Sequence, residues 1–390
     1  MSLEVVSLGC RLNLSESEGL RALLAGEDNL IVINSCAVTG EAVRQTRQAI
    51  RRARRARPDA RLLVTGCAAE VDRAALGAME EVDGLIANTA KLDPRAWNVA
   101  PAPMPVPSRH TRAFIAVQNG CDHACTFCVI PQGRGPSRTH DVASVLREVE
   151  RHLTAGAREV VLTGVDLTSW GHDLPDAPGL GVLVAAILVT FPALERLRLS
   201  SLDGVEIDPL LLELIAGEPR VMPHVHLSLQ SGDDLILKRM KRRHSRADAL
   251  ALVGGLRARR PELSVGADII AGFPTEDAAM HANSLAAIRE LGVVHGHIFP
   301  YSPRPGTPAA RMPQVPPPVI RARAAELRAA VAGERNLWLT SVLGTPLSVL
   351  AERDGTGHAP NFARVQLPPG TIAGTILTVT PTRIVEGLLA

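Results

Sequence analysis

The chain has 390 residues, of which 46% are hydrophobic and 21% are charged, a composition typical of folded globular proteins and unlike that of disordered or membrane-embedded chains. This length exceeds one ordinary hydrophobic core and predicts two or three domains. The formal net charge of +2 is nearly neutral, so any binding of nucleic acid must depend on local clusters of basic residues.

No targeting segment is expected at the start of the sequence. The first ten residues, MSLEVVSLGC, contain neither a basic segment nor an extended apolar core. The longest apolar stretch, residues 182–189, is much shorter than a membrane span. We therefore expect a cytoplasmic protein without a membrane partner. Six cysteines in a reducing compartment argue against a disulfide framework and favour metal or redox chemistry.

Strand-like and helix-like segments alternate over residues 1–88, which is the pattern of a small parallel β-sheet. Helices are expected at residues 14–24 and 41–57. Buried strands are predicted in LEVVSLG, LIVINS and RLLVTG. The stretch PAPMPVPS that follows is rich in proline and predicts a stiff, extended linker.

A second alternating series predicts a partial (β/α) barrel of the TIM type, built from six strand–helix units. Its strands are expected in RAFIAVQNG, EVVLTG, RLRLSS, HVHLSLQ, LSVGADIIAGF and VVHGHIFPY. A helix at residues 320–339 follows, and the short β-prone runs after residue 345 predict a small all-β, OB-like barrel. The predicted fold class is α/β, with domains at residues 1–100, 108–335 and 336–390.

Polar and apolar side chains alternate strictly along the predicted strand HVHLSLQ. Its polar face carries His224, His226, Ser228 and Gln230. On a barrel strand, such a face most simply lines the interior of the barrel. An exposed edge strand would show the same alternation and is the alternative.

Three cysteines, Cys121, Cys125 and Cys128, lie within eight residues in CDHACTFC. A CxxxCxxC loop gathers three thiolates, which suits a soft metal centre such as a 4Fe–4S cluster that keeps one iron open. A structural zinc site completed by His123 is the alternative. It is disfavoured because structural zinc sites usually take two separated pairs of ligands.

The other three cysteines each follow a predicted buried strand, in VVSLGC, IVINSC and LLVTGC. Because the carboxyl ends of parallel strands lie at one edge of a sheet, Cys10, Cys36 and Cys67 are expected to converge there. We interpret them as ligands of a second three-cysteine cluster. The alternative is that they are buried and serve as small hydrophobic side chains.

The stretch CDHACTFC resembles the signature of radical S-adenosylmethionine (SAM) enzymes, which carry an aromatic residue before the third cysteine. The resemblance implies that the open iron binds the amino and carboxylate groups of SAM, and that electron transfer cleaves SAM to a 5′-deoxyadenosyl radical. The stretches LTGVDLTSWG, LSLQSGDDLILKRMKR and GADIIAGFPTED resemble cofactor-contacting segments of this family. On that basis, contacts to SAM are expected from Phe127, Thr163, Gly164, Asp166, Ser228, Gln230, Ile270 and Phe273.

Both cysteine sets and the β-prone tail together resemble the methylthiotransferase family over essentially the whole chain. The stretches SLGCRLNLSESEG, INSCAVTGEAVRQTRQAIRRA and CDHACTFCVIPQGRGPSR are most similar to the branch that modifies N6-threonylcarbamoyladenosine at position 37 of tRNA. The resemblance implies two 4Fe–4S clusters and SAM as cofactors, and a C-terminal TRAM domain. It also implies a 2-methylthio product, tRNA as a partner, and an electron donor such as flavodoxin or ferredoxin. We expect a monomer.

Basic residues are clustered after Cys36. Seven arginines lie between Arg44 and Arg57. Those at helical spacing are predicted to form one stripe that contacts RNA phosphates, with a solvated helix face as the alternative. The stripe consists of Arg44, Arg47, Arg51 and Arg54.

Two further groups of basic residues are expected near substrate or cofactor. Arg134 and Arg138 directly follow the central cysteines. The other group consists of Lys238, Arg239, Lys241, Arg242 and Arg243.

Two other functions remain open. One is a methylthiotransferase that acts on a different tRNA adenosine or on an aspartate of a ribosomal protein. The other is a zinc-bearing RNA-binding module without catalysis. The arginine stripe and the sequence around Cys36 favour tRNA as the substrate.

Overall fold

The computed structural model describes residues 3–100 and 111–390. The chain forms two compact units, each assembled from separate stretches. The first unit comprises Met1–Ser108, Gln118–Arg138 and Ser302–Ala310, and the second comprises Arg109–Val117, Thr139–Tyr301 and Arg311–Ala390. The linker predicted at PAPMPVPS lies outside the described residues. The three domain limits expected from the sequence stay predictions.

The first unit contains a four-stranded parallel sheet, which confirms the expected N-terminal architecture. Its strands, in spatial order, are β1 (Glu4–Ser7), β2 (Leu30–Ser35), β3 (Arg61–Gly66) and β4 (Gly84–Leu85). Its helices are α1 (Arg11–Leu23), α2 (Gly40–Ala56), α3 (Cys67–Val71), α4 (Arg73–Gly77) and α5 (Ile130–Arg134), with a 3-10 turn at Pro94–Trp97. Every residue of β2 is buried, as expected for a central parallel strand covered on both faces.

The second unit contains the predicted partial barrel. Its strands are β5 (Arg112–Ala116), β8 (Glu159–Thr163), β9 (Arg196–Leu199), β11 (His224–Gln230), β12 (Ser264–Ala271) and β13 (Val293–Pro300). They pair in parallel as β5-β8-β9 and as β11-β12-β13, where the short β10 (Ser201–Leu202) is added beside β11. A bridge between Leu197 and Val221 joins the two sheets. The short strands β6 (Gln118–Asn119) and β7 (Arg138–Thr139) flank the central cysteines.

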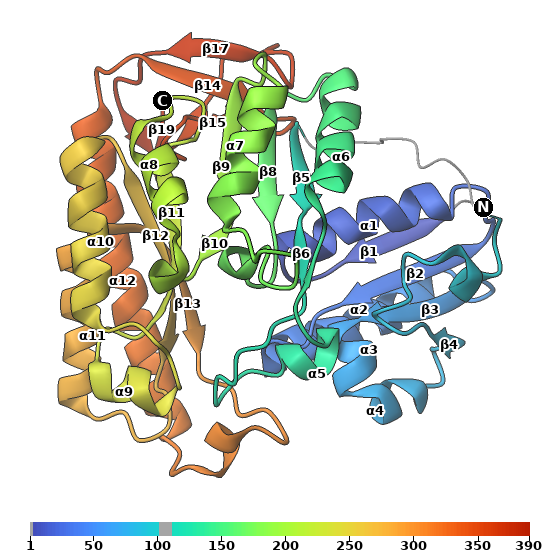
Figure 1. Cartoon of the computed structure of the whole chain (residues 1–390). Coiled ribbons are helices and arrows are strands. Elements are labelled where there is room, and N and C mark those ends of the chain that lie inside the picture. Colours follow the sequence, from blue (N-terminus) through green and yellow to red (C-terminus); the bar gives the residue numbers. More distant parts are fainter. Residues whose placement is uncertain (1–2, 101–110) are drawn as a thin grey trace. The chain divides into compact units, whose positions relative to one another are not determined.

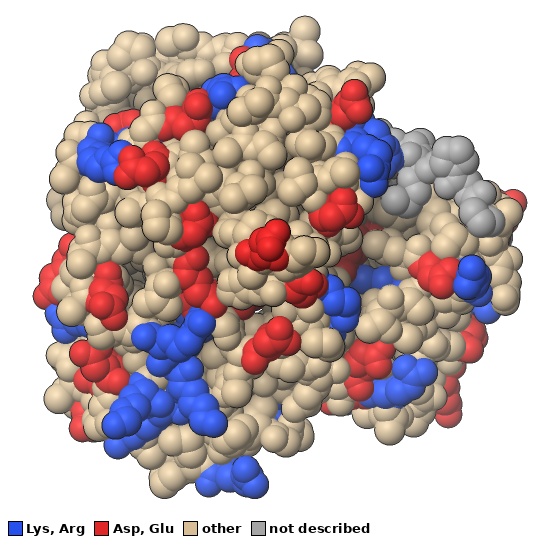
Figure 2. All heavy atoms as spheres, viewed as in Figure 1, with Lys and Arg blue, Asp and Glu red and all other residues tan. Residues whose placement is uncertain are grey.

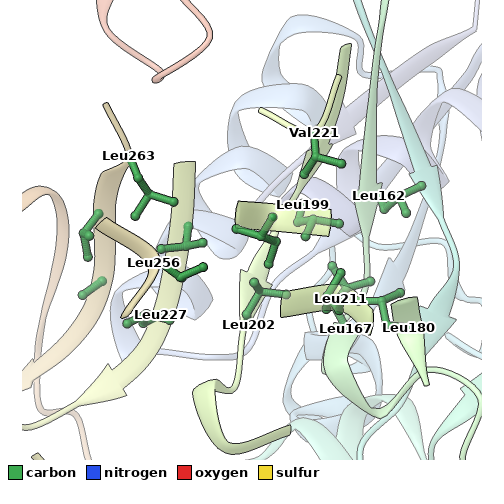
Figure 3. Packing of buried hydrophobic residues seen from close by; sticks show 14 of the residues in the cluster. Leu162, Leu167, Leu180, Leu199, Leu202, Leu211, Val221, Leu227, Leu256 and Leu263 are labelled. Carbon is green, nitrogen blue, oxygen red and sulfur yellow. The ribbon is translucent and has the colours of Figure 1, made fainter. Parts of the chain in front are cut away.

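Helices cover the outer face of the barrel strands. They are α6 (Val142–Thr154), α7 (Leu180–Thr190), α8 (Pro209–Gly217), α10 (Arg246–Arg259), α11 (Ala278–Leu291) and α12 (Pro317–Val342). The short helix α9 (Asp234–Arg239) follows the carboxyl end of β11. In Figure 1, α10, α11 and α12 lie alongside β11, β12 and β13. Figure 3 shows the core between strands and helices, where Leu162 and Leu199 pack against Leu180 and Leu211, which come from α7 and α8. Burial of these apolar side chains is the main stabilising contribution to this unit.

Strand β11 has neighbours on both sides, because β10 pairs with one edge and β12 with the other. The alternative reading of HVHLSLQ as an exposed edge strand is therefore wrong. Val225 and Leu227 belong to the hydrophobic cluster under the helices. The alternate residues, including His224 and His226, consequently face the interior of the barrel.

The residues from 347 onward form a six-stranded sheet in the same compact unit as the barrel. Its strands are β14 (Leu347–Ala351), β15 (Thr356–His358), β16 (Arg364–Gln366), β17 (Ile376–Val379), β18 (Ile384–Val385) and β19 (Leu388–Leu389). The sheet-rich C-terminal region is thus confirmed, whereas its assignment as a TRAM domain stays a prediction. Figure 1 shows β14, β15 and β17 above the end at which β8 and β9 begin.

A segment of this C-terminal sheet closes the amino end of the barrel. Phe362 packs against His224 and His295, at centroid distances of 4.9 and 5.3 Å. The guanidinium of Arg198, which is fully buried and paired with Glu159, lies 4.9 Å from the same ring. Phe362 thereby holds inner-face residues of β9, β11 and β13 together. Its φ of +67° is rare for a residue with a side chain and is maintained by this packing.

Candidate functional site

The central cysteines lie on a loop of the first unit whose backbone fixes their spacing. The Cys128 N–H donates to the Cys125 carbonyl at 3.1 Å, so a single turn brings these two residues together. The Cys121 N–H donates to the Gly135 carbonyl at 3.2 Å and ties the start of the loop to its end. All three cysteines are half-buried. The loop therefore presents three thiols from one short segment, as the CxxxCxxC spacing predicts.

The positive φ of Gly120 lets the chain turn into this loop. At φ +77°, a side chain at position 120 would collide with the Pro136 backbone. The Ser137 N–H donates to Asp122 Oδ1 at 3.0 Å and closes the loop from the other side. The Sγ atoms of Cys121 and Cys128 accept N–H groups of His123 and Ile130, each at 3.4 Å. Such contacts stabilise thiolates and fit a thiolate-bound metal centre.

The other three cysteines lie together at the carboxyl edge of the parallel sheet. Cys10 follows β1 and precedes α1, Cys36 follows β2, and Cys67 is the first residue of α3 after β3. Gly9, with φ +91°, allows close approach, because a Cβ added there would lie 2.7 Å from Cys36 Sγ. The sequence prediction that three strand ends would meet is supported by this placement. Ligation of a metal by these cysteines stays a prediction.

The environment of this second set is mostly buried. Burial, with a smaller contribution from the charges of the neighbouring Cys10 and Cys67, raises the pKa of the Cys36 thiol to about 11. Burial likewise raises the pKa of Cys67, while the Arg134 cation opposes that effect. Cys10 is exposed, whereas Cys36 and Cys67 are buried. Thiols in such a setting become good ligands only when a cation or metal offsets their charge.

A buried charged network lies beside the second set and provides cations. Arg134, at the end of α5, pairs with Glu16 of α1 through two contacts of 2.9 and 3.0 Å. Lys91 Nζ contacts the same carboxylate at 2.5 Å. All three side chains are at most 4% exposed. Although burial opposes ionisation of Arg134, the Glu16 carboxylate holds its pKa above the usual range.

Neutral amides complete the network and connect it to the sheet. Asn13 accepts a hydrogen bond from Arg134, and Asn119 Oδ1 accepts another at 2.8 Å. Asn13 Nδ2 also donates to the Ser35 carbonyl, next to Cys36, at 2.9 Å. Removal of one partner from such a network leaves buried polar groups without compensation.

The segment after the central cysteine loop packs directly on Cys67. Asn88 Nδ2 donates to the Gly133 carbonyl at 2.5 Å and lies 4.0 Å from Cys67 Sγ. A Cβ at Gly133 would lie 3.2 Å from Cys67 Cβ, so only a small residue fits there. Within the first unit, α5 thus connects the two cysteine sets: it begins two residues after Cys128 and ends at Arg134.

Sequence reasoning missed Glu16, Lys91 and Asn13. A signal was present, because Asn13, Glu16 and Leu20 recur at intervals of three and four on α1 and share one buried face. Arg134 was expected near substrate or cofactor. In the structure its guanidinium is buried against Glu16 and Asn13, and its proximity to a cofactor stays a prediction. The pairing of Glu16 with Arg134 joins residues 118 positions apart and carries no local pattern.

The expected SAM-binding residues of the barrel lie at the carboxyl ends of three strands. Thr163 ends β8, Gln230 ends β11, and Ile270 is next to last in β12. Gly164 and Asp166 follow β8, Ser228 precedes Gln230, and Phe273 follows β12. Active sites of (β/α) barrels occupy this end. The structure therefore places all seven at one edge of the barrel, and Phe127 in the cysteine loop; contact with SAM stays a prediction.

Two backbone irregularities shape this edge. The pairing register of β11 with β12 shifts between Leu227 and Gln230, and Gln230 has a left-handed φ of +64°. Gly272, with φ +69°, turns the chain after β12 so that Phe273 packs edge-to-face on Tyr301 at 5.6 Å. Bulges and left-handed residues at strand ends commonly re-aim side chains at functional sites.

The arginine stripe of α2 is only partly available to a partner. Arg44 and Arg51 have side-chain exposures of 67% and 55%, and pair with Glu41 and Glu81. Arg54 is different, because its guanidinium donates to the carbonyls of Pro58, Ala60 and Glu81 and to Asp83 at 2.7–3.1 Å. Arg54 therefore caps the turn after α2. RNA binding by the stripe stays a prediction.

The second basic group lies on and after α9. Figure 2 shows a cluster of Lys and Arg over the part of the surface where Figure 1 places α9. Lys238 and Lys241 are exposed, whereas Arg242 and Arg243 form ion pairs with Asp203 at 2.9 and 3.0 Å. Only part of this group is thus available for binding phosphates.

Two family models match the sequence. The radical SAM superfamily matches residues 115–286, and a family described as uncharacterized protein family UPF0004 matches residues 2–87. The threonylcarbamoyladenosine tRNA methylthiotransferase MtaB of Rickettsia prowazekii is 44% identical over 99% of this chain and 96% of its own length. The MtaB protein of Aquifex aeolicus is 35% identical over 83% of this chain and 86% of its own length. The tRNA-2-methylthio-N(6)-dimethylallyladenosine synthase of Cereibacter sphaeroides is 32% identical over 90% of this chain and 87% of its own length.

Among solved structures, the radical SAM methyltransferase TsrM from Kitasatospora setae superposes with a TM-score of 0.54 at 16% identity, covering 76% of this chain and 66% of that chain. The match supports the fold of the barrel. The identity along the whole chain to the Rickettsia protein shows that the chain belongs to the MtaB family of radical SAM tRNA methylthiotransferases.

Proposed function

We propose that this protein inserts a methylthio group at carbon 2 of N6-threonylcarbamoyladenosine at position 37 of tRNA. The observation that carries the proposal is the presence of two three-cysteine sets in one compact unit, joined by α5. One set would suffice for a radical SAM enzyme. A second set at a sheet edge fits a reaction that needs a separate place for sulfur. The relative that matches 99% of this chain carries this activity in its name.

Cys121, Cys125 and Cys128 would hold the first 4Fe–4S cluster. The loop fits such a cluster, because its three thiols come from one short segment and two of the Sγ atoms accept backbone N–H groups. A cluster bound there would supply the electron that cleaves SAM to a carbon radical. Residues at the carboxyl ends of β8, β11 and β12 would orient SAM.

Cys10, Cys36 and Cys67 would hold the second cluster, which would supply the sulfur that is methylated and transferred. The fit rests on charge, because three thiolates in a buried setting need compensation. Arg134 and Lys91 provide two cations, of which Glu16 neutralises one. The net positive charge that remains beside Cys67 suits an anionic thiolate-bound group.

The tRNA would bind through phosphate contacts. Exposed arginines of α2, together with Lys238 and Lys241 in the second unit, are the groups that support this part of the proposal. A flavodoxin or ferredoxin would donate electrons, and the protein would act as a cytoplasmic monomer. Within residues 3–100 and 111–390, no helix is long and apolar enough to cross a membrane.

The decisive experiment is mass spectrometry of tRNA nucleosides from cells that lack the protein. Loss of 2-methylthio-N6-threonylcarbamoyladenosine, restored by the wild-type gene, would support the proposal. If 2-methylthio-N6-dimethylallyladenosine is lost instead, the substrate would be the dimethylallyladenosine named for the Cereibacter relative. Unchanged tRNA would overturn the proposal and favour a protein substrate or a non-catalytic role.

A further inference from the structure

Three polar side chains meet inside the barrel of the second unit, which contains neither cysteine set. His226 lies on β11, Asp268 on β12 and His297 on β13. His226 Nε2 and His297 Nδ1 each lie 3.0 Å from Asp268 Oδ1. The two imidazole rings are 4.6 Å apart. We call His226, Asp268 and His297 the interior triad.

The interior triad faces the barrel interior because its neighbours along each strand face the helices. Leu227, Ala267 and Ile298 belong to the hydrophobic core under the helices. Side chains alternate along strands, so His226, Asp268 and His297 lie on the opposite face. Gly266 confirms how tightly His226 is held, since a Cβ at that position would overlap with its Nδ1 atom.

The interior is filled on the amino-terminal side of the triad, and one member of the triad is exposed. Toward the amino end, His224, His295 and Phe362 fill the interior with ring contacts of 4.9–5.4 Å. His226 has a side-chain exposure of 7% and Asp268 of 20%, but His297 is 59% exposed. Toward the carboxyl end, the next inward-facing residue of β12 is Ile270, one of the expected SAM contacts. The triad therefore shares the inner face of β12 with an expected SAM contact, one inward-facing position away.

Proton positions follow from the geometry. An ionised carboxylate only accepts hydrogen bonds, so His226 Nε2 and His297 Nδ1 both carry protons that they donate to Asp268. Although burial opposes ionisation, these two hydrogen bonds hold the pKa of Asp268 well below its usual range. His297 Nε2 is left to face a ligand. A carboxylate bound there would accept a hydrogen bond from Nε2–H of the doubly protonated ring, while Nδ1–H donates to Asp268.

We propose that His297, oriented by Asp268 and His226, binds the carboxylate of the threonylcarbamoyl group through Nε2–H. The inference rests on the proposed function and names the group that selects the substrate. The threonylcarbamoyl substituent ends in a carboxylate, whereas a dimethylallyl substituent is a hydrocarbon. A hydrogen-bond donor that meets the carboxylate discriminates between the two. Asp268 and His226 are positioning residues.

The test measures binding of an anticodon stem–loop RNA that carries N6-threonylcarbamoyladenosine, compared with the same RNA in which the carboxylate is a primary amide. Binding is measured by fluorescence anisotropy without SAM. Wild type is expected to favour the carboxylate by about 10- to 100-fold, the range of one hydrogen bond to a charged group. His297→Ala and His297→Gln are each expected to bind both RNAs equally, at the level of wild type with the amide.

A matched control is His281→Ala. His281 on α11 contacts Glu326 on α12 at 2.8 Å, so it is also a histidine–carboxylate pair, but on the covering helices. This variant is expected to keep the full preference for the carboxylate. Gly266→Ala should weaken the preference, because it displaces His226.

Four outcomes would overturn the inference. Equal binding of both RNAs by wild type would show that the protein does not recognise the carboxylate. Equal weakening of both RNAs in His297→Ala would indicate an RNA phosphate as the ligand. If that variant no longer cleaves SAM in the absence of RNA, the ligand of His297 would be the carboxylate of SAM. A divalent metal retained by wild type and lost from His297→Ala would make the triad a metal site.

These outcomes are separable from failure of the proposed function. If wild type binds the carboxylate preferentially but forms no methylthiolated nucleoside, the function fails and the recognition site stands. If wild type forms the product from both RNAs at equal rates and binds them equally, the function stands and the inference fails.

Discussion

The two cysteine sets of the first unit are built by opposite means. Cys121, Cys125 and Cys128 are close in sequence, and a single loop with one turn brings them together. Cys10, Cys36 and Cys67 are separated by strands and helices, and only the parallel sheet makes them neighbours. The first set depends on local backbone geometry, whereas the second depends on the whole fold of the unit. A change in folding stability should therefore affect the second set first.

The largest effect is expected from Cys121→Ala. Two remaining thiolates hold a cluster poorly, so reductive cleavage of SAM should fall by at least about 100-fold, a loss typical of removing an essential cofactor site. The measurement is the rate of 5′-deoxyadenosine formation after anaerobic reconstitution. A rate equal to that of wild type would show that the loop does not hold the cluster that cleaves SAM.

Cys36→Ala should separate the two sets functionally. Because Cys36 contributes nothing to the loop, 5′-deoxyadenosine should still form at a rate near that of wild type. The methylthiolated nucleoside should disappear. Iron content should fall by about half, from roughly eight to four irons per chain, if each set holds one 4Fe–4S cluster. Normal product from this variant would show that the three strand-end cysteines serve only in packing.

Arg134→Gln tests how the two sets are connected. It removes the hydrogen bonds that Arg134 donates to Glu16, Asn13 and Asn119, while Lys91 still pairs with Glu16. A buried acceptor left unpaired typically costs about 1–3 kcal/mol of stability. The denaturant midpoint of the full chain should fall, and iron should be lost from the second set before the first. Arg138→Gln is the matched control, because that arginine lies four residues away and is exposed. Equal stability of both variants would mean that the network contributes nothing.

The smallest effect is expected on RNA affinity. Replacing Arg44, Arg51 and Arg55 with Glu reverses charge on the exposed face of α2 and spares Arg54, which caps the turn after the helix. Each lost phosphate contact should lower the slope of log affinity against log salt by about one unit.

The control for that variant replaces exposed arginines on the outer helices of the second unit: Arg147, Arg289 and Arg321. The salt slope of this control should match that of wild type. If the α2 variant also keeps the wild-type slope, the exposed face of α2 is solvated surface and RNA binding must lie elsewhere.

Features of this chain that are signalled by residues close together in the sequence could be predicted. The loop of Cys121 could be recognised from spacing alone, and the three strand-end cysteines from a motif that recurs after each apolar run. The strands of the barrel were located because apolar side chains alternate or cluster along them. Arg54 shows where spacing misleads: its position on the helix fits the stripe, but the carbonyls it contacts come from the following turn and from Glu81.

Interactions between distant segments could not be predicted. Glu16 and Arg134 are 118 residues apart, and neither has a neighbour that signals the other. The interior triad is similar, since β11 showed a polar face but nothing identified Asp268 or His297 as its partners. The β-prone tail was predicted, whereas the insertion of Phe362 into the end of the barrel was not. Tertiary packing decides these contacts.

The closure of the barrel by Phe362 has a consequence for synthesis. Arg198 Nη1 donates to the carbonyl of Pro360, which is added to the chain 162 residues later. At about 5–20 residues per second, the ribosome takes roughly 8–32 seconds to cover that interval. During that time the nascent barrel holds a guanidinium and a carboxylate without the residues that cover them. Chaperones that shelter the open end, and truncations that remove the last strands, should therefore have more influence on the yield of this protein than changes at its chemical centres.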